Sequence, residues 1–264
     1  MEGVATVLAM LVGILALLRF YRQKENIFLF LGTGFIGASF LDGYHSVVSS
    51  PMFIQYFPSP PPSLIPWSGL ASRMFFSVLL WLSWLFWRRE SRMGQSARVP
   101  EYRVFFVVNT WTLACFLFFA LLPLPTAYSP LPVFHRPQEF ISIFFCLLAL
   151  NGYLHKGSWK HDPFEHCLVL SIILFVVHSI YMSSSARLYD ATYIAAHVLR
   201  LSSYVCTLVG IILALRLLAR DRETTPARRT DHLHTEISAR NSAEGAVLAA
   251  RTRQNPSSIP FPRS

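Results

Sequence analysis

Residues 31–46 have the sequence LGTGFIGASFLDGYHS, and they lie inside an apolar run that is long enough to cross a membrane. One face of an α-helix at this place would carry two small and two ionisable residues, Gly34, Ala38, Asp42 and His45. The small residues allow a second helix to approach closely, so the two ionisable side chains are expected to point into that contact. A carboxylate is costly in hydrocarbon, and Asp42 is therefore a candidate functional residue.

The composition of the chain is that of a membrane protein with several spans. Of its 264 residues, 53% are hydrophobic and only 14% are charged. The net charge of +9 does not indicate nucleic-acid binding, because the basic residues lie mainly at the ends of apolar runs and in the tail. The four cysteines form no CxxC pair, so neither a disulfide framework nor a zinc site is expected.

Seven apolar segments are predicted to span the membrane, which makes the expected fold an all-α bundle of seven transmembrane helices. Each segment approaches the roughly 20 residues that a helical span needs. The segments are Val4–Phe20, Ile27–Val47, Ser68–Trp87, Val104–Leu122, Pro137–Leu154, Phe164–Ser183 and Ala191–Leu218.

The distribution of basic residues predicts how the bundle is oriented. Alternate connectors and the tail hold nearly all of the arginines and lysines, whereas the other connectors hold only Arg136 and Arg187. The positive-inside rule therefore places the N-terminus outside and the C-terminus in the cytoplasm, with the protein in the inner (plasma) membrane. Two proline-rich outer connectors, Ser50–Pro66 and Pro123–Pro137, are expected to form no regular helix.

The composition changes after the last span, which predicts a division into a membrane domain, residues 1–220, and a cytoplasmic tail, residues 221–264. Pro226 is expected to interrupt any helix that continues from the span. Residues 233–247 regain helical spacing through Leu233, Ile237 and Val247, so a short helical linker is predicted there. The proline- and serine-rich residues Asn255–Ser264 are expected to be disordered.

With this topology, ionisable residues from five spans lie in the outer half of the membrane. These residues are Asp42, His45, Arg73, Glu139, His178, His197 and Arg200. The two acids and the two arginines can neutralise one another, since the planar guanidinium suits a carboxylate. Such pairs can simply lock the bundle together, or they can line a pocket for a small ligand, and the sequence leaves both readings open.

The three histidines at this level allow two further hypotheses. His45, His178 and His197 could ligate a metal or a haem, or they could titrate near neutral pH and sense protons. An isolated histidine in a span is more often hydrogen-bonded to a neighbour, so no cofactor is expected. The chain has no GxSxG, HExxH or phosphate-binding glycine loop, and we therefore expect no enzyme activity.

Several motifs resemble the third type of bacterial membrane-associated sensor domain. FLGTGFIGASFLDGYHSV and PWSGLASRMFFSVLLWLSWL are similar to a family pattern of a D-x-x-H-like element followed by a tryptophan and an arginine. Here Asp42, His45, Trp67 and Arg73 occupy those positions. AAHVLRLSSYVCTLVGIILAL resembles the closing helix of the family, with matches at His197, Arg200 and Ser203, and Glu139 lies in a weaker match, so the resemblance covers roughly residues 4–220.

The resemblance implies a sensory input domain that precedes a cytoplasmic histidine kinase, diguanylate cyclase or PAS domain. The implied partners are the lipid bilayer, an unknown small ligand, a second copy of the chain paired through the last span and linker, and the output domain. The sequence stops before any output domain, so we expect either a truncated product of a longer sensor or a stand-alone sensor, and we favour the truncated product. The alternatives are a small transporter or channel, and a membrane haem protein.

Overall fold

The computed structural model describes the backbone of residues 1–254, with side chains for residues 1–220 except Gln95, and for Arg240 and Glu244. Over this part of the chain it contains no strand. Its α-helices are α1 Glu2–Gln23, α2 Asn26–Val48, α3 Pro61–Met93, α4 Glu101–Leu121, α5 Glu139–Lys156, α6 Pro163–Ser184 and α7 Ala191–Gln254. Three short 3₁₀-helices, η1 Ile54–Tyr56, η2 Gly94–Ala97 and η3 Ser158–Lys160, lie in connectors. The prediction of an all-helical protein is therefore confirmed for the described residues.

Six of the described helices are long and apolar enough to span a membrane. They are α1, α2, α3, α4, α6 and the part of α7 from Ala191 to Arg220. Helix α5 has only 18 residues, and these include Glu139 at one end and His155 and Lys156 at the other. The span expected over Pro137–Leu154 is the fifth of the seven predicted segments. It therefore stays a prediction, and so does the count of seven.

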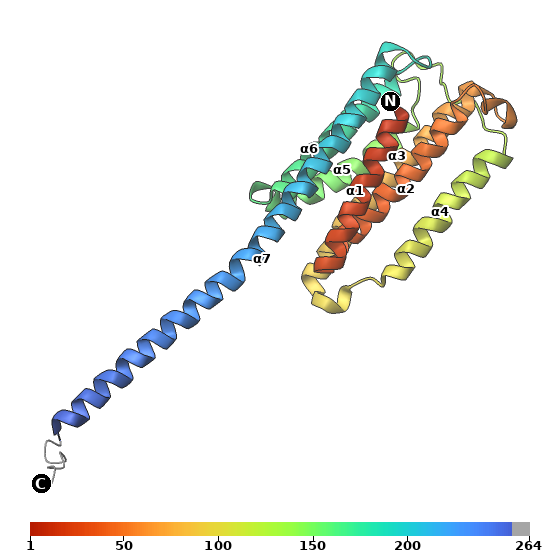
Figure 1. Ribbon diagram of the computed structural model, residues 1–264. Helices are drawn as coiled ribbons and strands as arrows, with labels where there is room; N and C mark the ends of the chain where they lie inside the picture. The colour runs from red at the N-terminus through yellow and green to blue at the C-terminus, as the bar shows by residue number, and fades with distance from the viewer. Residues whose placement is uncertain (255–264) are drawn as a thin grey trace, which may run out of the picture. The chain divides into compact units, whose positions relative to one another are not determined.

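Helix α2 is the central helix of the bundle. It packs against α1, α3 and α4, and nearly all of its length is buried, whereas α4 lies at the edge and is mostly exposed (Figure 1). The predicted small-residue face of α2 does meet a second helix: a Cβ atom on Gly34 would lie 3.1 Å from the Cβ of Leu79 on α3. One turn farther along, the Ser72 hydroxyl on α3 donates to the backbone oxygen of Ala38, 3.4 Å away. Asp42 and His45 therefore lie in a helix contact, as their spacing predicts.

The expectation that residues 50–66 contain no regular helix is wrong for residues 61–66, because α3 begins at Pro61. Proline is well tolerated in the first turn of a helix, where its missing N–H would have no intrahelical partner in any case. Pro61 and Pro62 occupy this first turn, and Pro66 lies inside the helix. The helix therefore begins well before the predicted span at Ser68.

The chain separates into two compact units, Met1–Leu215 and Arg216–Ser264. The backbone helix α7 includes Pro226, so the expected interruption there is wrong. A proline removes a single backbone hydrogen bond, and the turns on either side can hold the helix together. The side chains of the predicted linker, Leu233, Ile237 and Val247, and the predicted disordered segment Asn255–Ser264 lie outside the described residues. The predicted domain division at residue 220 stays a prediction.

The close contact between α1 and α2 depends on the absence of a side chain at Gly13 of α1. A Cβ atom on Gly13 would lie 2.6 Å from Cγ1 of Ile36, and 2.9 Å from both the Gly32 oxygen and the Ile36 nitrogen. Since backbone atoms cannot move aside, we expect Gly13→Ala to lower the free energy of unfolding by roughly 1–3 kcal/mol. Thermal unfolding in detergent micelles measures the change.

Gly3 provides the matched control on the same helix, because a Cβ atom added to it would have no other atom within 4 Å. Gly3→Ala should leave the unfolding midpoint unchanged or raise it slightly, since alanine favours helix more than glycine. Equal midpoints for the two variants would contradict the close approach of α1 and α2.

Candidate functional site

Arg200 on α7 is the centre of a group of buried charges. Its side chain is 1% exposed, and Nη1 donates to Oδ1 of Asp42 on α2 at 3.2 Å. Nη2 donates to a carboxylate oxygen of Glu2 on α1. The phenol of Tyr204, one turn along α7, donates to the other oxygen of Asp42 at 3.3 Å. Acids from two helices thus converge on one arginine of a third.

Two histidines contact the other carboxylate oxygen of Glu2. Nε2 of His197 forms an ion pair with this oxygen, and Nε2 of His45 lies 3.7 Å from it. The second ring nitrogen of each histidine has a fixed partner: Nδ1 of His45 is 2.8 Å from the Ser68 hydroxyl, and Nδ1 of His197 is 2.8 Å from the Tyr193 carbonyl oxygen. We define Glu2, Asp42, His45, His197, Arg200 and Tyr204 as the charge cluster.

The contacts of His197 require a proton between it and Glu2. A backbone carbonyl only accepts hydrogen bonds, so Nδ1 of His197 must carry a hydrogen to bond to Tyr193. In a neutral ring, Nε2 would then be an acceptor facing the carboxylate oxygen of Glu2, which also only accepts. The close contact of these two atoms is therefore stable only when a proton is shared between them.

A second ion pair lies beside the charge cluster and connects α3 to α5. Nε and Nη2 of Arg73 donate to the two carboxylate oxygens of Glu139 at 2.9 and 2.5 Å. This bidentate arrangement matches the planar guanidinium to the carboxylate. A Cβ atom on Gly69 would lie 3.1 Å from Nη1 of Arg73 and 3.2 Å from Cε1 of His45, so the pair and the cluster share this glycine as a neighbour.

The structure thus brings together most of the residues that the sequence singles out. Asp42, His45, His197 and Arg200 belong to the cluster, and Arg73 and Glu139 form the adjacent pair. The remaining histidine, His178, is buried, with Nδ1 2.7 Å from the Ala196 carbonyl oxygen and its ring centre 6.5 Å from that of His197.

Trp67 lies apart from these charges. Its indole N–H donates to the backbone oxygen of Pro125 at 3.0 Å. Its ring lines an apolar cavity of about 560 Å³ between α3 and α4, together with Leu70, Met74, Trp111 and Phe118. Trp67 therefore does not join the group that its motif position suggests.

Sequence reasoning missed Glu2, although it is the only acid in the first apolar helix. Its position at the chain start suggests an ordinary terminal charge, yet three other ionisable residues contact its carboxylate. Glu2 could have been found from the predicted topology. A residue at the start of the first span is expected at the same membrane level as Asp42 and His197.

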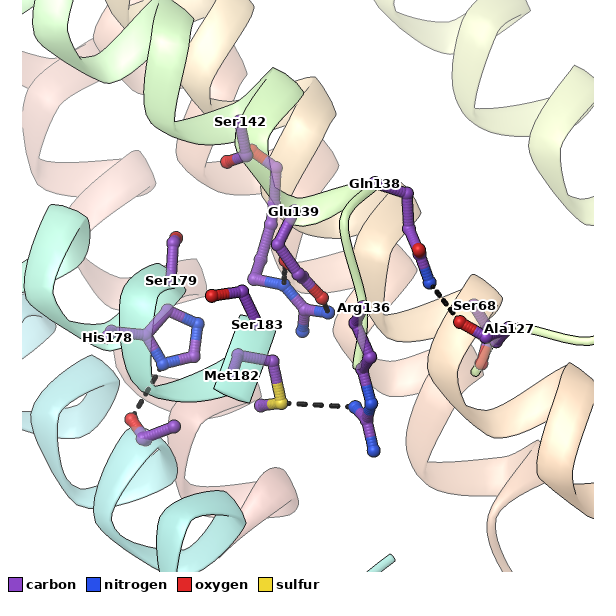
Figure 2. A network of polar contacts seen from close by, with 12 residues as sticks. Ser68, Ala127, Arg136, Gln138, Glu139, Ser142, His178, Ser179, Met182 and Ser183 are labelled. Atoms are coloured by element: carbon purple, nitrogen blue, oxygen red, sulfur yellow. Dashed lines mark hydrogen bonds and ion pairs between the residues drawn. The ribbon is translucent and has the colours of Figure 1, made fainter. Parts of the chain in front are cut away.

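Sequence reasoning also treated Arg136 only as a connector residue, whereas the structure buries it. Its side chain is 1% exposed, Nη2 donates to the Tyr128 hydroxyl at 2.5 Å, and Nη1 lies 3.2 Å from the sulfur of Met182 (Figure 2). Burial raises the pKa of the Tyr128 phenol, although the charge of Arg136 opposes that shift. The phenol therefore stays neutral, and the contact anchors the connector to the end of α6.

The start of α7 is set by Asp190, which places His197 and Arg200 on the helix. One carboxylate oxygen accepts from the Tyr193 backbone N–H and the Thr192 hydroxyl at 2.7 Å, and the other accepts from the Arg187 backbone N–H at 3.1 Å. Partial burial favours the neutral carboxyl, but these hydrogen bonds outweigh it and lower the pKa of Asp190 to about 2. The carboxylate therefore caps the helix at neutral pH.

The described side chains contain no group of three or more histidines, cysteines and acids that could hold a metal ion. Hydrogen bonds to carbonyl oxygens occupy Nδ1 of both His178 and His197. Only the Nε2 atoms of these rings would remain for ligation, and that of His197 faces Glu2. The expectation of no cofactor stays a prediction, and ligation of a metal or haem by His45, His178 and His197 stays its alternative.

The Arg73–Glu139 pair allows a direct test of how strongly burial couples two charges. Arg73→Met alone leaves a buried carboxylate without its partner, so we expect it to lower the free energy of unfolding by about 3–5 kcal/mol. Arg73→Met combined with Glu139→Leu removes both charges and should recover most of that loss. Equilibrium unfolding in mixed micelles, arranged as a double-mutant cycle, measures the coupling. A double variant as unstable as the sum of the single variants would contradict the pairing.

Comparison with known proteins identifies the class to which this arrangement belongs. The model of one family, MASE3, described as a membrane-associated sensor domain, matches residues 1–214. No curated protein and no solved structure matched the chain. The matched residues include α1 to α6 and the cluster residues of α7, and the resemblance to this family of sensor domains is confirmed. The chain is a multi-pass membrane protein with a sensory input role, and it belongs to the MASE3 family of membrane-associated sensor domains.

Proposed function

We propose that this protein detects a proton or a small ligand through its charge cluster and relays the signal along α7 to a cytoplasmic output domain. In this proposal the protein lies in the plasma membrane, with its N-terminus outside and its C-terminus inside. The cluster then lies in the outer half of the membrane, and the output is a histidine kinase, diguanylate cyclase or PAS domain.

The observation that carries the proposal is the convergence of α1, α2 and α7 on Arg200. Glu2 and Asp42 both place a negative charge against this one guanidinium. The helix that carries Arg200 continues along the chain to Gln254, and an output domain would follow it in the sequence. A change in these contacts acts directly on the helix that leads out of the membrane domain.

The charges of the cluster favour a proton or a cationic group over an anion. Glu2 and Asp42 carry two negative charges and Arg200 one positive charge, so the net charge is −1 while both histidines are neutral. A proton on His197 makes the sum zero. An anionic ligand would have to displace a carboxylate from Arg73 or Arg200, because both arginines are already paired.

Groups from six helices determine when His197 holds its proton. Nearby charges of the same sign oppose protonation and those of opposite sign favour it. The ionisable groups around this site are Glu2 on α1, Asp42 and His45 on α2, Arg73 on α3, Glu139 on α5, His178 on α6, and Tyr193, Arg200 and Tyr204 on α7.

The proposed relay is a shift between two packing arrangements of α7. Loss of the proton separates His197 from Glu2, because two acceptors cannot remain in contact. A ligand can shift such an equilibrium only by its difference in affinity for the two states, so the binding group must contact α7 in one state more than in the other. A homodimer paired through the last span and the linker would pass the shift to the output domains.

Three alternatives remain to be compared with this proposal. The charges can be purely structural and lock the helices together.

A transporter or channel would need a polar path to the opposite face, whereas Ser171, Ser203 and Thr207 on α6 and α7 bond to one another and to backbone oxygens. A haem protein would show strong visible absorption when purified, and a featureless spectrum would exclude it.

A chimera with a reporter output tests the proposal. Residues 1–254 are fused to a histidine kinase whose transcriptional output is measured while the external pH is varied between about 5 and 8. We expect Asp42→Asn and Arg73→Gln to abolish signalling. We expect Glu2→Gln and His197→Gln to flatten the pH response by about tenfold, because the shared proton then has no site.

Arg187→Gln is the matched control, since Arg187 is exposed in the connector before α7. This variant should signal like the wild type, and all variants should insert into the membrane at equal levels. Normal signalling by both Asp42→Asn and Arg73→Gln would show that the charges are structural. A normal pH response of Glu2→Gln and His197→Gln would exclude the proton and leave a ligand as the signal.

A further inference from the structure

A second cavity lies at the opposite, arginine-rich end of the bundle, between α3 and α5. Its volume is about 410 Å³. It is lined mainly by aromatic and basic side chains, including Trp84, Arg88 and Arg92 of α3 and Asn151, His155 and Lys156 of α5. No acidic residue lines it. The cavity therefore presents a positive field to whatever enters it.

The two arginines of this cavity lack a carboxylate partner among the described residues. Arg88 and Arg92 are four residues apart on α3, so they share one face, and neither forms an ion pair with a described acid. Lys156 differs, because Glu165 neutralises it. The guanidinium of Arg88 lies 5.5 Å from the centre of the Trp84 ring, an arrangement that holds the cation without neutralising it.

Trp84 forms a fixed wall of the cavity. A Cβ atom on Gly152 of α5 would overlap the indole ring, so the ring packs directly on the backbone of α5. The absence of a side chain at Gly152 is what leaves room for Trp84. The shape of this site is therefore set by the contact between two helices.

An adjoining cavity of about 510 Å³ shares Arg88 and Arg92 with the cavity of about 410 Å³. Its other lining residues, all on α3, are Arg89 and the apolar Leu85, Phe86 and Met93. Arg88 and Arg92 thus line both cavities, and the adjoining cavity adds apolar side chains beside its arginines. A molecule that fits both must carry an anionic group next to a hydrocarbon chain.

The position of the site on α3 favours a component of the bilayer itself. Helix α3 has 33 residues and is therefore about 50 Å long, which exceeds the roughly 30 Å of hydrocarbon in a membrane. Part of α3 must therefore lie outside the hydrocarbon, and its last turns have the tryptophans and arginines that are enriched in the headgroup region. Basic pockets between spans at this level are suited to anionic lipid headgroups.

We propose that the two cavities bind one anionic glycerophospholipid, with its phosphate on Arg88 and Arg92 and an acyl chain along Leu85 and Phe86. The planar guanidinium groups suit phosphate oxygens, and Trp84 packs against the glycerol region. Arg88 and Arg92 lie on the same helix as Arg73. The lipid would stabilise the arginine-rich end of α3 independently of what occupies the charge cluster.

Native mass spectrometry of the full chain tests the proposal. The protein is released from nanodiscs that contain equal amounts of phosphatidylglycerol and phosphatidylcholine, and the retained lipid is counted. We expect the wild type to retain one phosphatidylglycerol, and Arg88→Gln with Arg92→Gln to reduce its occupancy roughly 10- to 30-fold, as the loss of two interfacial cations implies. Glycerol phosphate in millimolar excess should not displace the lipid, because it lacks the acyl chain.

The matched control removes two exposed arginines at the same end of the bundle that do not line either cavity, Arg22→Gln with Arg103→Gln. This variant should retain the lipid like the wild type. Arg88→Lys with Arg92→Lys keeps both charges, guards against loss of folding, and should retain the lipid more weakly than the wild type. Equal loss in the control variant, or full retention by the glutamine variant, would overturn the proposal.

Discussion

The buried guanidinium of Arg200 is the constraint on which the rest of the bundle depends. A charge that is 1% exposed in a membrane protein must be neutralised by groups within hydrogen-bonding distance. Here Asp42 of α2 and Glu2 of α1 supply the negative charge, so the first two helices meet α7, which is distant in sequence, at one level. Because two carboxylates face one arginine, the group needs a further positive charge, and His197 can supply it by holding a proton against Glu2.

The packing of the other helices follows from keeping every buried charge paired. Helix α2 must bring Asp42 to α7 and also approach α1 and α3 closely, which Gly32 and Gly34 permit by leaving room for neighbouring side chains. Arg73 and Glu139 extend the same principle to α3 and α5. The opposite end of α3 differs, because Arg88 and Arg92 project from the last turns with no described acid beside them. The buried charges at one end are thus neutralised internally, whereas the other end combines internal pairs such as Lys156–Glu165 with these two unpaired arginines.

The sequence predicted the helices and the level of each charge well, but it predicted partners only in part. Hydropathy and charge patterns determine where a helix lies and how deep each residue is, so Asp42, His45, His197 and Arg200 could be placed at one level. They do not determine which face meets which neighbour, and Trp67 was grouped with these residues although it faces α4. Glu2 was missed because a first-turn acid is usually exposed. The prolines of α3 and α7 were expected to exclude helix, yet the backbone tolerates them at a helix start and between stable turns.

The central claim is that the Arg200 contacts hold the N-terminal part of α7 against α1 and α2. Hydrogen–deuterium exchange of the protein in nanodiscs measures this most directly, by comparing the wild type with Arg200→Gln. The account predicts faster exchange of the backbone amides in residues 191–210 of α7 and in the first turns of α1, with no change in α5, since Arg73 and Glu139 remain paired. Unchanged exchange in α7, or an equal increase in every helix, would contradict it.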